Sequence, residues 1–283
     1  NLYFYMFQIN WKLKALLYKV FGVFRLKIFF IQKHITKRSR VEINQVNELW
    51  THHADAIEKY NAKNILEVGA GKSLEQNIYI SYKFNNLIKQ TTIDINRMID
   101  LDYVNQASEQ IANILKLKFK GKVKNIEELK DIYKIEYIAP FFLKSLKSKY
   151  DMCISTAALE HFKISNLKEY LNDLKNVLKT DGLISSIIDY SDHYSHTDSK
   201  ISSLNYLSYS KKAWEKYNNQ YLFQNRLRHQ DYIKMFEAGG YKIKEVFLGN
   251  TLTPPKIISD EFDVNDKDVF LGWSYILMSK RSN

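Results

Sequence analysis

The residues best suited to chemistry lie in one short segment that combines histidines with aspartates. Residues 189–198 read DYSDHYSHTD, with two histidines and three aspartates. An imidazole titrates near neutral pH, so it can take the proton of a hydroxyl group. We therefore predict His193 or His196 as a general base, with Asp192 as the carboxylate that orients it. The alternative is a polar loop whose histidines bond only to the backbone.

The spacing His193-x-x-His196 in the same segment is also found in metal sites. Two histidines and one aspartate in a loop are an incomplete set of ligands for a closed site, so no metal is expected. Cys153 is the one cysteine of the chain, which excludes a cysteine-built zinc site and an intrachain disulfide. This use of cysteine favours a reducing compartment.

A third histidine, His161, comes shortly after a predicted buried strand at Tyr150–Ser155. His193 and His196 follow another predicted strand, at Gly182–Asp189. In a parallel α/β sheet, ligands bind beyond the carboxyl ends of the strands. The position of all three histidines after these strands therefore makes them candidates for one catalytic site.

Two arginines further along the chain are candidates for binding an acidic substrate. Arg226 and Arg228 are separated by one residue, so in an extended segment they point the same way and could clamp a phosphate or a carboxylate. The alternative is a salt bridge to Asp198 or Asp231. Two tyrosines of the histidine-rich segment complete the candidate substrate-binding residues: Tyr190 and Tyr194.

A glycine loop, Gly69-Ala70-Gly71, directly follows the apolar run Asn64–Val68 and is typical of a backbone that a ligand approaches closely. The phosphate loop of nucleotide hydrolases needs a glycine where this chain has Leu66. The dinucleotide-binding fingerprint needs glycine or alanine where it has Leu74. Neither phosphate-binding interpretation fits well.

The loop instead resembles the first motif of the class I S-adenosylmethionine-dependent methyltransferases, with Ser73 at the third small position. That resemblance implies S-adenosylmethionine as cofactor. It also implies that Asp94, which ends the predicted strand Thr91–Asp94, accepts hydrogen bonds from both ribose hydroxyls. The cofactor-binding residues that the resemblance implies are Glu67, Gly69, Ala70, Gly71, Asp94, Asn125, Ile126 and Thr156.

The fourth predicted strand and its turn, residues 150–162, resemble the strand of that family that ends in Leu-Glu-His. Asp181-Gly182-Leu183 resembles the turn before the family's fifth strand. The resemblance covers about residues 60–189 and the last two strands. It implies an α/β fold: a Rossmann-like, seven-stranded, mostly parallel sheet with helices on both faces.

The hydrophobic pattern places the elements that must position these residues. Helices are expected over 42–60, from about Leu74, over 103–116, Leu167–Leu178 and Asp231–Ala238. Strands are expected at Asn64–Val68, Thr91–Asp94, Val123–Leu129, Tyr150–Ser155, Gly182–Asp189, Lys242–Leu248 and Ser274–Ser279. We expect one catalytic domain over residues 42–283, with a substrate-binding insertion at about 190–230.

Positive charge is concentrated at the start of the chain. Nine of the 42 lysines and arginines precede Glu42, the first acidic residue, and the remainder is close to neutral. We expect residues 1–41 to form a basic helical arm, attached either to an anionic membrane surface or to the core or a second subunit. Lysines interrupt its apolar runs, so neither a spanning helix nor a signal peptide is expected. Residues 1–4 resemble the end of a protease site used to remove purification tags, which makes Met6 the expected native start.

The expected reaction is methyl transfer to an oxygen. The histidine-rich segment and the later Asn-Arg-Leu-Arg resemble methyltransferases encoded among bacterial surface-polysaccharide genes, which implies a sugar, a sugar nucleotide or an anionic, phosphate-bearing or phosphoramidate-bearing glycan precursor as acceptor. Residues 155–158 lack the Asp/Asn-Pro-Pro-aromatic turn of DNA amino-methylating enzymes, so nucleic acid is not the expected partner. An RNA or other small-molecule methyltransferase and a non-catalytic scaffold stay as alternatives. A cytoplasmic protein is expected, either free or peripheral at the inner face of the membrane.

Overall fold

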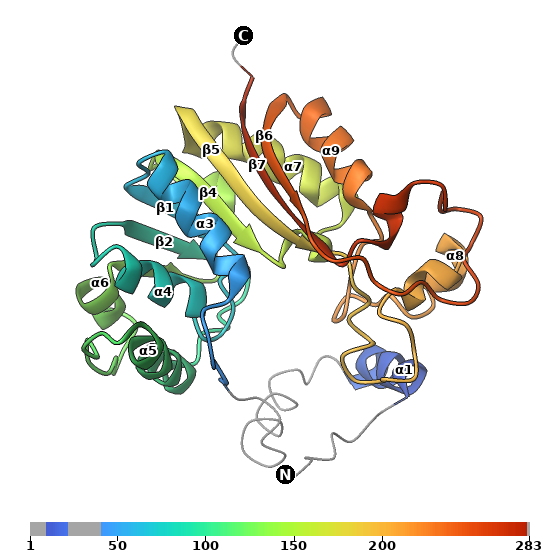
Figure 1. Cartoon of the computed structure of the whole chain (residues 1–283), viewed down its shortest axis with the longest axis horizontal. Helices are drawn as coiled ribbons and strands as arrows, with labels where there is room; N and C mark the ends of the chain where they lie inside the picture. Colours follow the sequence, from blue (N-terminus) through green and yellow to red (C-terminus); the bar gives the residue numbers. More distant parts are fainter. Residues whose placement is uncertain (1–9, 22–40, 282–283) are drawn as a thin grey trace.

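A single sheet of seven strands forms the centre of the protein, whose computed structural model describes residues 10–21 and 41–281 (Figure 1). The strand order is β3-β2-β1-β4-β5-β7-β6. The strands are β1 (Asn64–Val68), β2 (Lys89–Ile93), β3 (Ile135–Ile138), β4 (Tyr150–Thr156), β5 (Leu178–Asp189), β6 (Tyr241–Leu248) and β7 (Trp273–Lys280). Strand β7 is antiparallel to both of its neighbours, β5 and β6, and every other neighbouring pair among these strands is parallel. The expected Rossmann-like, mostly parallel sheet is confirmed.

Helices cover both faces of the sheet (Figure 1). The described helices are α1 (Trp11–Phe21), α3 (Glu48–Lys59), α4 (Glu75–Lys83), α5 (Leu101–Leu115), α6 (Glu128–Tyr133), α7 (Ile164–Val177), α8 (Lys211–Trp214) and α9 (His229–Ala238). Successive side chains of a strand point to opposite faces, so Leu66 packs in the core under α7 and α9. Its neighbour Ile65 packs in the core under α3 and α4.

The pattern of α7 explains why it lies where it does. Leu167, Leu171 and Leu174 recur at the spacing of one helical face, and all three are buried. The chain enters β5 at Leu178 directly after the helix ends at Val177. The predicted helix was Leu167–Leu178, so its existence is confirmed and its start is earlier by three residues.

The predicted third strand is wrong. Residues 123–129 form no strand; β3 is Ile135–Ile138, pairs with β2, and is preceded by α6. The backbone of Val123 forms its hydrogen bonds with the side chain of Asn105 instead of with a strand. The Val123 N–H donates to Asn105 Oδ1 at 2.7 Å, and Asn105 Nδ2 donates to the Val123 carbonyl at 2.9 Å. Apolar content alone did not reveal that a side chain takes the place of a neighbouring strand.

The insertion after β5 builds a separate cluster of aromatic residues, which we call the cap: α1, residues 190–228 and residues 249–272. In Figure 1 the cap lies beyond one end of the sheet, around α1 and α8. The hydrophobic core of this cluster consists of Trp11, Ala15, Tyr194, Leu204, Tyr206, Leu207 and Trp214. The sequence predicted the part near 190–230, but residues 249–272 between β6 and β7 were not assigned to it.

Helix α1, the described part of the basic arm, packs on this chain through Trp11. The indole is 3% exposed, and its ring centroid lies 4.6 Å from that of Tyr217 and 5.4 Å from that of Tyr194. Its backbone N–H donates to Asp198 Oδ2 at 3.0 Å. The arm is therefore a structural part of the cap over residues 11–21.

The opposite side of α1 carries a second apolar row. Leu13, Leu16, Leu17 and Val20 are each at least 40% exposed. None of the helices within residues 10–21 and 41–281 has both the length and the apolar character to cross a membrane. Lys12, Lys14 and Lys19 lie on α1, and the remaining basic residues of the arm lie outside the described residues. Contact of the arm with a membrane stays a prediction.

Candidate functional site

The loop after β1 contains two glycines, and each is required for a different physical reason. Gly69 has φ +85°, and a Cβ placed on it would lie 2.9 Å from Ala158 Cβ, so packing against the turn after β4 excludes a side chain. Gly71 has φ +76°, yet a Cβ there would meet no described atom within 4 Å. Since L-residues rarely adopt these angles, both positions require glycine, and Gly71 faces room for a ligand.

A cavity of about 320 Å³ opens beside this loop. Gly69 and Asp94 lie on its wall, beyond the carboxyl ends of β1 and β2. The remaining lining residues are Val68, Ile93, Ile95, Phe141, Phe142, Leu143, Lys144, Phe162, Asn166, Glu169, Tyr170 and Asp173. The cavity is thus mostly apolar with one strand-end carboxylate, a composition that suits a nucleoside.

Asp94 is the carboxylate with access to this cavity from the end of β2. Burial raises its pKa to about 6, although the hydroxyl of Tyr137, which donates to Asp94 Oδ2 at 3.1 Å, favours the charged form. Asp94 is therefore ionised at neutral pH. A carboxylate in this position can accept hydrogen bonds from two neighbouring hydroxyls.

Glu67 does not line the cavity. It is 3% exposed, and its two oxygens accept from the side-chain amides of Gln76 and Asn77, in the first turn of α4. Burial raises the pKa of Glu67 to about 8. Its role in the described structure is to tie α4 to the end of β1, which fixes the glycine loop between them. Ala70 and Gly71 belong to that loop and are not lining residues either.

Thr156 belongs to a buried polar chain that the sequence did not reveal. Its hydroxyl donates to Gln76 Oε1 at 2.7 Å and lies 2.9 Å from His53 Nε2. His53 Nδ1 lies 2.7 Å from Ser185 Oγ, and burial lowers the pKa of His53 to about 3, so this ring is neutral. The chain links α3, β4, β5 and α4 under the glycine loop and positions the loop from below.

Asn125 and Ile126, predicted to contact the cofactor, are not lining residues of the cavity. Asn125 is exposed, and its Oδ1 accepts from Glu128 N–H at 3.0 Å at the start of α6. The wall that follows the third strand is instead residues 141–144. The signal that could have found it is the adjacent pair Phe141-Phe142, which would follow the third strand once β3 is placed correctly.

The three candidate histidines do come together, beyond the carboxyl ends of β4 and β5. The ring centroids of His161 and His193 are 4.9 Å apart, with planes at 61°. The rings of His193 and His196 stack with centroids 5.1 Å apart and planes at 24°. The three rings therefore lie side by side, and their catalytic role stays a prediction.

Asp192 does not orient His193. It is fully buried, accepts from Asn205 Nδ2 at 2.9 Å and from Tyr194 N–H, and so holds the cap loop. Asp189 is the partner: its Oδ2 lies 3.2 Å from His193 Nε2. Burial raises the pKa of Asp189, but hydrogen bonds from His193 and Ser191 outweigh it and hold the pKa below its ordinary value. The carboxylate four residues before the histidine, and not the adjacent one, reaches the ring.

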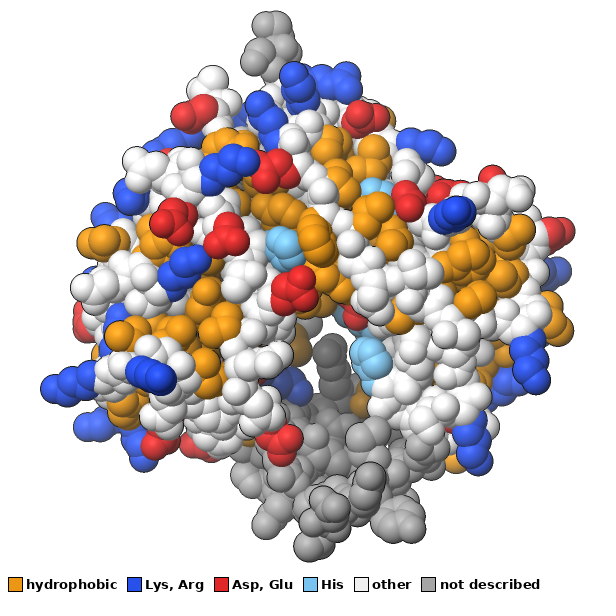
Figure 2. Space-filling view, in the orientation of Figure 1, with side chains coloured by type: hydrophobic (Ala, Val, Ile, Leu, Met, Phe, Trp, Pro, Cys, Tyr) orange, Lys and Arg blue, Asp and Glu red, His pale blue; other side chains and the backbone are white. Residues whose placement is uncertain are grey.

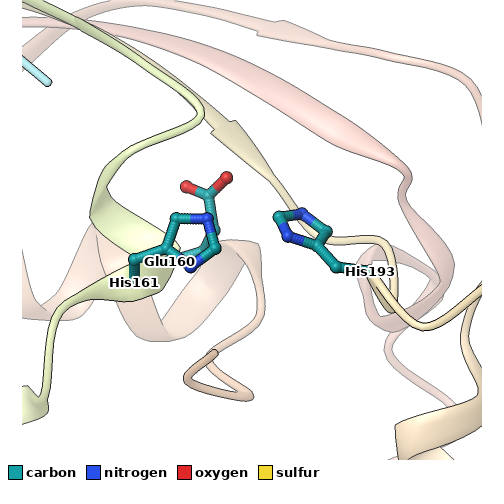
Figure 3. A group of neighbouring side chains, drawn as sticks. All are labelled: Glu160, His161 and His193. Atoms are coloured by element: carbon teal, nitrogen blue, oxygen red, sulfur yellow. The ribbon is translucent and has the colours of Figure 1, made fainter. Parts of the chain in front are cut away.

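Glu160 lies next to these histidines and was not among the predicted site residues. Its side chain is 1% exposed, and neither carboxylate oxygen has a well-formed hydrogen bond among the described residues. Burial and the nearby charge of Asp189 raise the pKa of Glu160 well above its ordinary value, and the backbone N–H groups of Glu160 and Asp189 offset this only in part. One ligand atom each from Glu160, His161 and His193 lie within 4.8 Å of one another (Figure 3).

The prediction that Arg226 and Arg228 clamp an acidic substrate is wrong. Arg226 pairs with Glu261 Oε2 at 2.8 Å and also donates to the carbonyl of Tyr209. Arg228 is 4% exposed and donates to the carbonyls of Tyr190 and Leu271 at 2.8 and 2.6 Å. The alternative partners were wrong as well, since only the backbone N–H of Arg228 contacts Asp231. Both guanidinium groups hold the cap together.

The two candidate substrate-binding tyrosines are also structural. Tyr190 is 1% exposed, and its hydroxyl lies 2.7 Å from Ser274 Oγ. Tyr194 is buried against Trp11, and its hydroxyl donates to the carbonyl of Tyr217 at 2.8 Å. Neither is open to a substrate. Figure 2 shows that the face of the molecule between the sheet and the cap is hollowed, with acidic and histidine side chains at the edge of the hollow.

No protein-family model and no curated protein sequence matches the chain. Among solved structures, it is similar to a 1,6-didemethyltoxoflavin-N1-methyltransferase of Burkholderia thailandensis, determined with S-adenosylhomocysteine: 11% identity, TM-score 0.49, covering 94% of this chain and 90% of that one.

Two further similar structures belong to longer proteins. One is the mitomycin 7-O-methyltransferase, at 10% identity and TM-score 0.44, and the other is a carbon methyltransferase, at 15% identity and TM-score 0.43. The matches cover 82% and 80% of this chain, which spans about half of each of those proteins: 53% and 51%. At such identities the likeness is one of fold alone, so the function has to be argued from the residues of the site.

Proposed function

We propose that the chain is an S-adenosylmethionine-dependent methyltransferase acting on a hydroxyl group. One observation carries the proposal: Asp94 and Gly69 lie on the wall of one cavity, at the carboxyl ends of adjacent parallel strands. The cavity fits the nucleoside part of such a cofactor, because an ionised carboxylate for ribose hydroxyls stands beside an apolar wall. The room at Gly71 gives the remainder of the cofactor access to the loop.

The histidine cluster supports a hydroxyl as the methyl acceptor. S-adenosylmethionine supplies, when bound, a methyl group on a positively charged sulfur. The protein must then hold the acceptor oxygen in line with that methyl group and remove its proton. His161, His193 and His196 can do the second of these, and Asp189 holds His193 in orientation. Phe162 lines the cavity and directly follows His161, so the two parts of the site are adjacent in the chain.

For the acceptor we propose a sugar or a sugar nucleotide. Its support is the resemblance of the loop after β5 to methyltransferases encoded among surface-polysaccharide genes. The anionic group of the acceptor has weaker support, because Arg226 and Arg228 contact Glu261 and backbone carbonyls of the cap. A neutral sugar ring therefore suits the described site as well as a phosphate-bearing one.

Calorimetry with S-adenosylhomocysteine tests the proposal. We expect binding, and we expect Asp94→Ala to weaken it at least about tenfold, because two charge-assisted hydrogen bonds are lost. Asp151→Ala is the control: this carboxylate lies at the opposite end of β4 and contacts Lys179. Absence of binding at millimolar ligand would contradict the proposal and favour a non-catalytic scaffold. Equal affinity in Asp94→Ala would contradict the ribose assignment.

A further inference from the structure

We propose that Glu160, His161 and His193 bind a divalent transition-metal ion at the acceptor end of the site. The three side chains come from two segments that are more than 30 residues apart and meet beyond the ends of β4 and β5 (Figure 3). One candidate ligand atom of each lies within 4.8 Å of the other two. Ligands about 2.0–2.2 Å from a shared ion stand about 3–4 Å apart, so a small inward movement would complete the site.

The hydrogen bonds of the two rings decide which nitrogen carries a lone pair. His161 Nδ1 lies 2.8 Å from the carbonyl oxygen of Phe223, which can only accept, so the proton is on Nδ1. His193 Nε2 lies 3.2 Å from Asp189 Oδ2, which puts its proton on Nε2. Neutral rings in these states offer lone pairs on His161 Nε2 and His193 Nδ1. Metal-binding histidines are typically held in this way, with the other nitrogen donating to a carbonyl or a carboxylate.

Glu160 gives the second, independent indication of a ligand. A charged carboxylate buried without a hydrogen bond is strongly unfavourable unless a proton or a cation neutralises it. Neither Glu160 oxygen has a well-formed hydrogen bond among the described residues, the backbone N–H groups of Glu160 and Asp189 offset its burial only in part, and the side chain is 1% exposed. It faces the rings of His161 and His193 (Figure 3). A cation between them would neutralise the carboxylate and use both lone pairs.

The ligand types select the class of ion. Mg²⁺ and Ca²⁺ prefer oxygen ligands, whereas imidazole suits Mn²⁺-to-Zn²⁺ first-row ions, and two histidines with one carboxylate leave positions open for a substrate. His193 is only partly buried and His161 is exposed, so the histidine side of the cluster is accessible to an entering ion and to an acceptor. The earlier expectation of a site without metal considered His193-x-x-His196 alone and lacked Glu160.

The catalytic consequence rests on the proposed function. A bound cation would hold the acceptor hydroxyl and lower its pKa. The proton would pass to His196, whose ring stacks on that of His193 with the centroids 5.1 Å apart. The hydroxyl oxygen would form its bond to the methyl carbon as the carbon–sulfur bond breaks, and the electron pair of that bond would stay on sulfur. His193 would then be a ligand and His196 the base.

Titration of the tag-free full chain with Co²⁺ tests the site, because the visible absorption of Co²⁺ reports nitrogen and oxygen ligands directly. We expect binding at one ion per chain, and at least about a hundredfold loss of affinity in Glu160→Gln and in His193→Ala. Asp189→Asn should lose about 10–100-fold, as expected for a group that orients a ligand. Glu67→Gln is the matched control: it removes another buried carboxylate, whose oxygens accept from amides, and should bind Co²⁺ normally.

The same samples are titrated with S-adenosylhomocysteine, so that the two proposals can fail separately. No Co²⁺ binding at millimolar concentration, or binding unchanged in Glu160→Gln, overturns the metal site even where the cofactor analogue binds. Binding of Co²⁺ without the cofactor analogue supports the site and contradicts the methyltransferase proposal. Full methyl transfer after EDTA treatment would also overturn the catalytic role of the ion, whereas activity restored by Mn²⁺ or Co²⁺ supports it.

Discussion

The two halves of the candidate site are built in different ways. The cofactor half consists of the glycine loop and Asp94, each directly after a strand and close in the sequence to the element that positions it. The acceptor half consists of Glu160, His161 and His193, brought together from two loops and held by the cap. The first half depends mainly on local backbone geometry, and the second depends on contacts between distant segments.

This difference explains where sequence patterns succeed. At Gly69 and Gly71, the left-handed backbone itself selects the residue type, so the pattern is visible without the fold. At Arg228, the same residue type could bind a substrate or a carbonyl, and only the tertiary structure distinguishes the two. The cap is anchored by such contacts, and so charged residues that look functional in the sequence turn out to hold it together.

The largest expected effect is on the acceptor half. His193→Ala should lower kcat at least about a hundredfold, because it removes a ligand of the proposed metal ion. The measurement is radiolabelled methyl transfer to the best acceptor among a panel of sugar nucleotides. The affinity for S-adenosylhomocysteine should stay within about twofold, because His193 does not line the cofactor cavity. His52→Ala, in a ring that stacks on Tyr275, is the control. Unchanged turnover in His193→Ala would show that the histidine cluster takes no part in the reaction.

The second prediction concerns the anchoring of the cap. Trp11→Ala should destabilise the cap by about 3–5 kcal/mol, because a buried indole leaves a cavity among Tyr194, Trp214 and Tyr217. Hydrogen exchange over residues 190–228 is the measurement. The expected result is faster exchange in this segment, while cofactor binding persists.

Leu16→Ala on the same helix is the matched control for Trp11→Ala. Leu16 is 57% exposed, so its truncation should change stability by about 0.5 kcal/mol or less. Equal protection of the cap in wild type and Trp11→Ala would show that α1 adds nothing to it. Loss of cofactor binding together with cap protection would show instead that the two halves unfold as one unit.

The third prediction uses the raised pKa of Asp94. Its carboxylate is ionised above about pH 6, so affinity for S-adenosylhomocysteine should be about tenfold weaker at pH 5 than at pH 8. The stability of the cofactor-free protein changes in the opposite direction: a carboxyl group whose pKa is raised by folding contributes stability that is lost as pH rises through about 6. In Asp94→Asn, the pH dependence of cofactor affinity should flatten. An equally steep profile in that variant would assign the titration to another group.

The smallest effect is expected at Arg226, one of the two arginines that the sequence predicted to bind an acidic substrate. Arg226→Ala should leave the KM of the acceptor within about twofold, because its guanidinium contacts Glu261 and the carbonyl of Tyr209. Glu261→Ala is the paired variant, and the two single variants and the double variant form a double-mutant cycle in which only a weak coupling is expected, because Glu261 is solvent-exposed. A rise in KM above tenfold in Arg226→Ala alone would restore this residue to the acceptor site.

Much of the fold was predictable from residue patterns. The run Asn64–Val68 and the periodic leucines of α7 have the spacing of a buried strand and of a packed helical face, and both are where the patterns put them. The third strand was not predictable in this way. Val123 looks like a strand residue, but its backbone bonds go to the side chain of Asn105, and no local pattern records that choice.

The sequence by itself determined the sheet, the glycine loop and Asp94, because backbone angles and strand ends act over a few residues. Tertiary structure alone decided that Asp189 rather than Asp192 holds His193, that Arg226 and Arg228 serve the cap, and that Glu160 faces two histidines. The physical reason is that a polar side chain takes whichever partner the fold brings within hydrogen-bond distance. The side chains of Arg226 and Arg228 take partners between 17 and 43 residues away, and residue spacing carries no information about them.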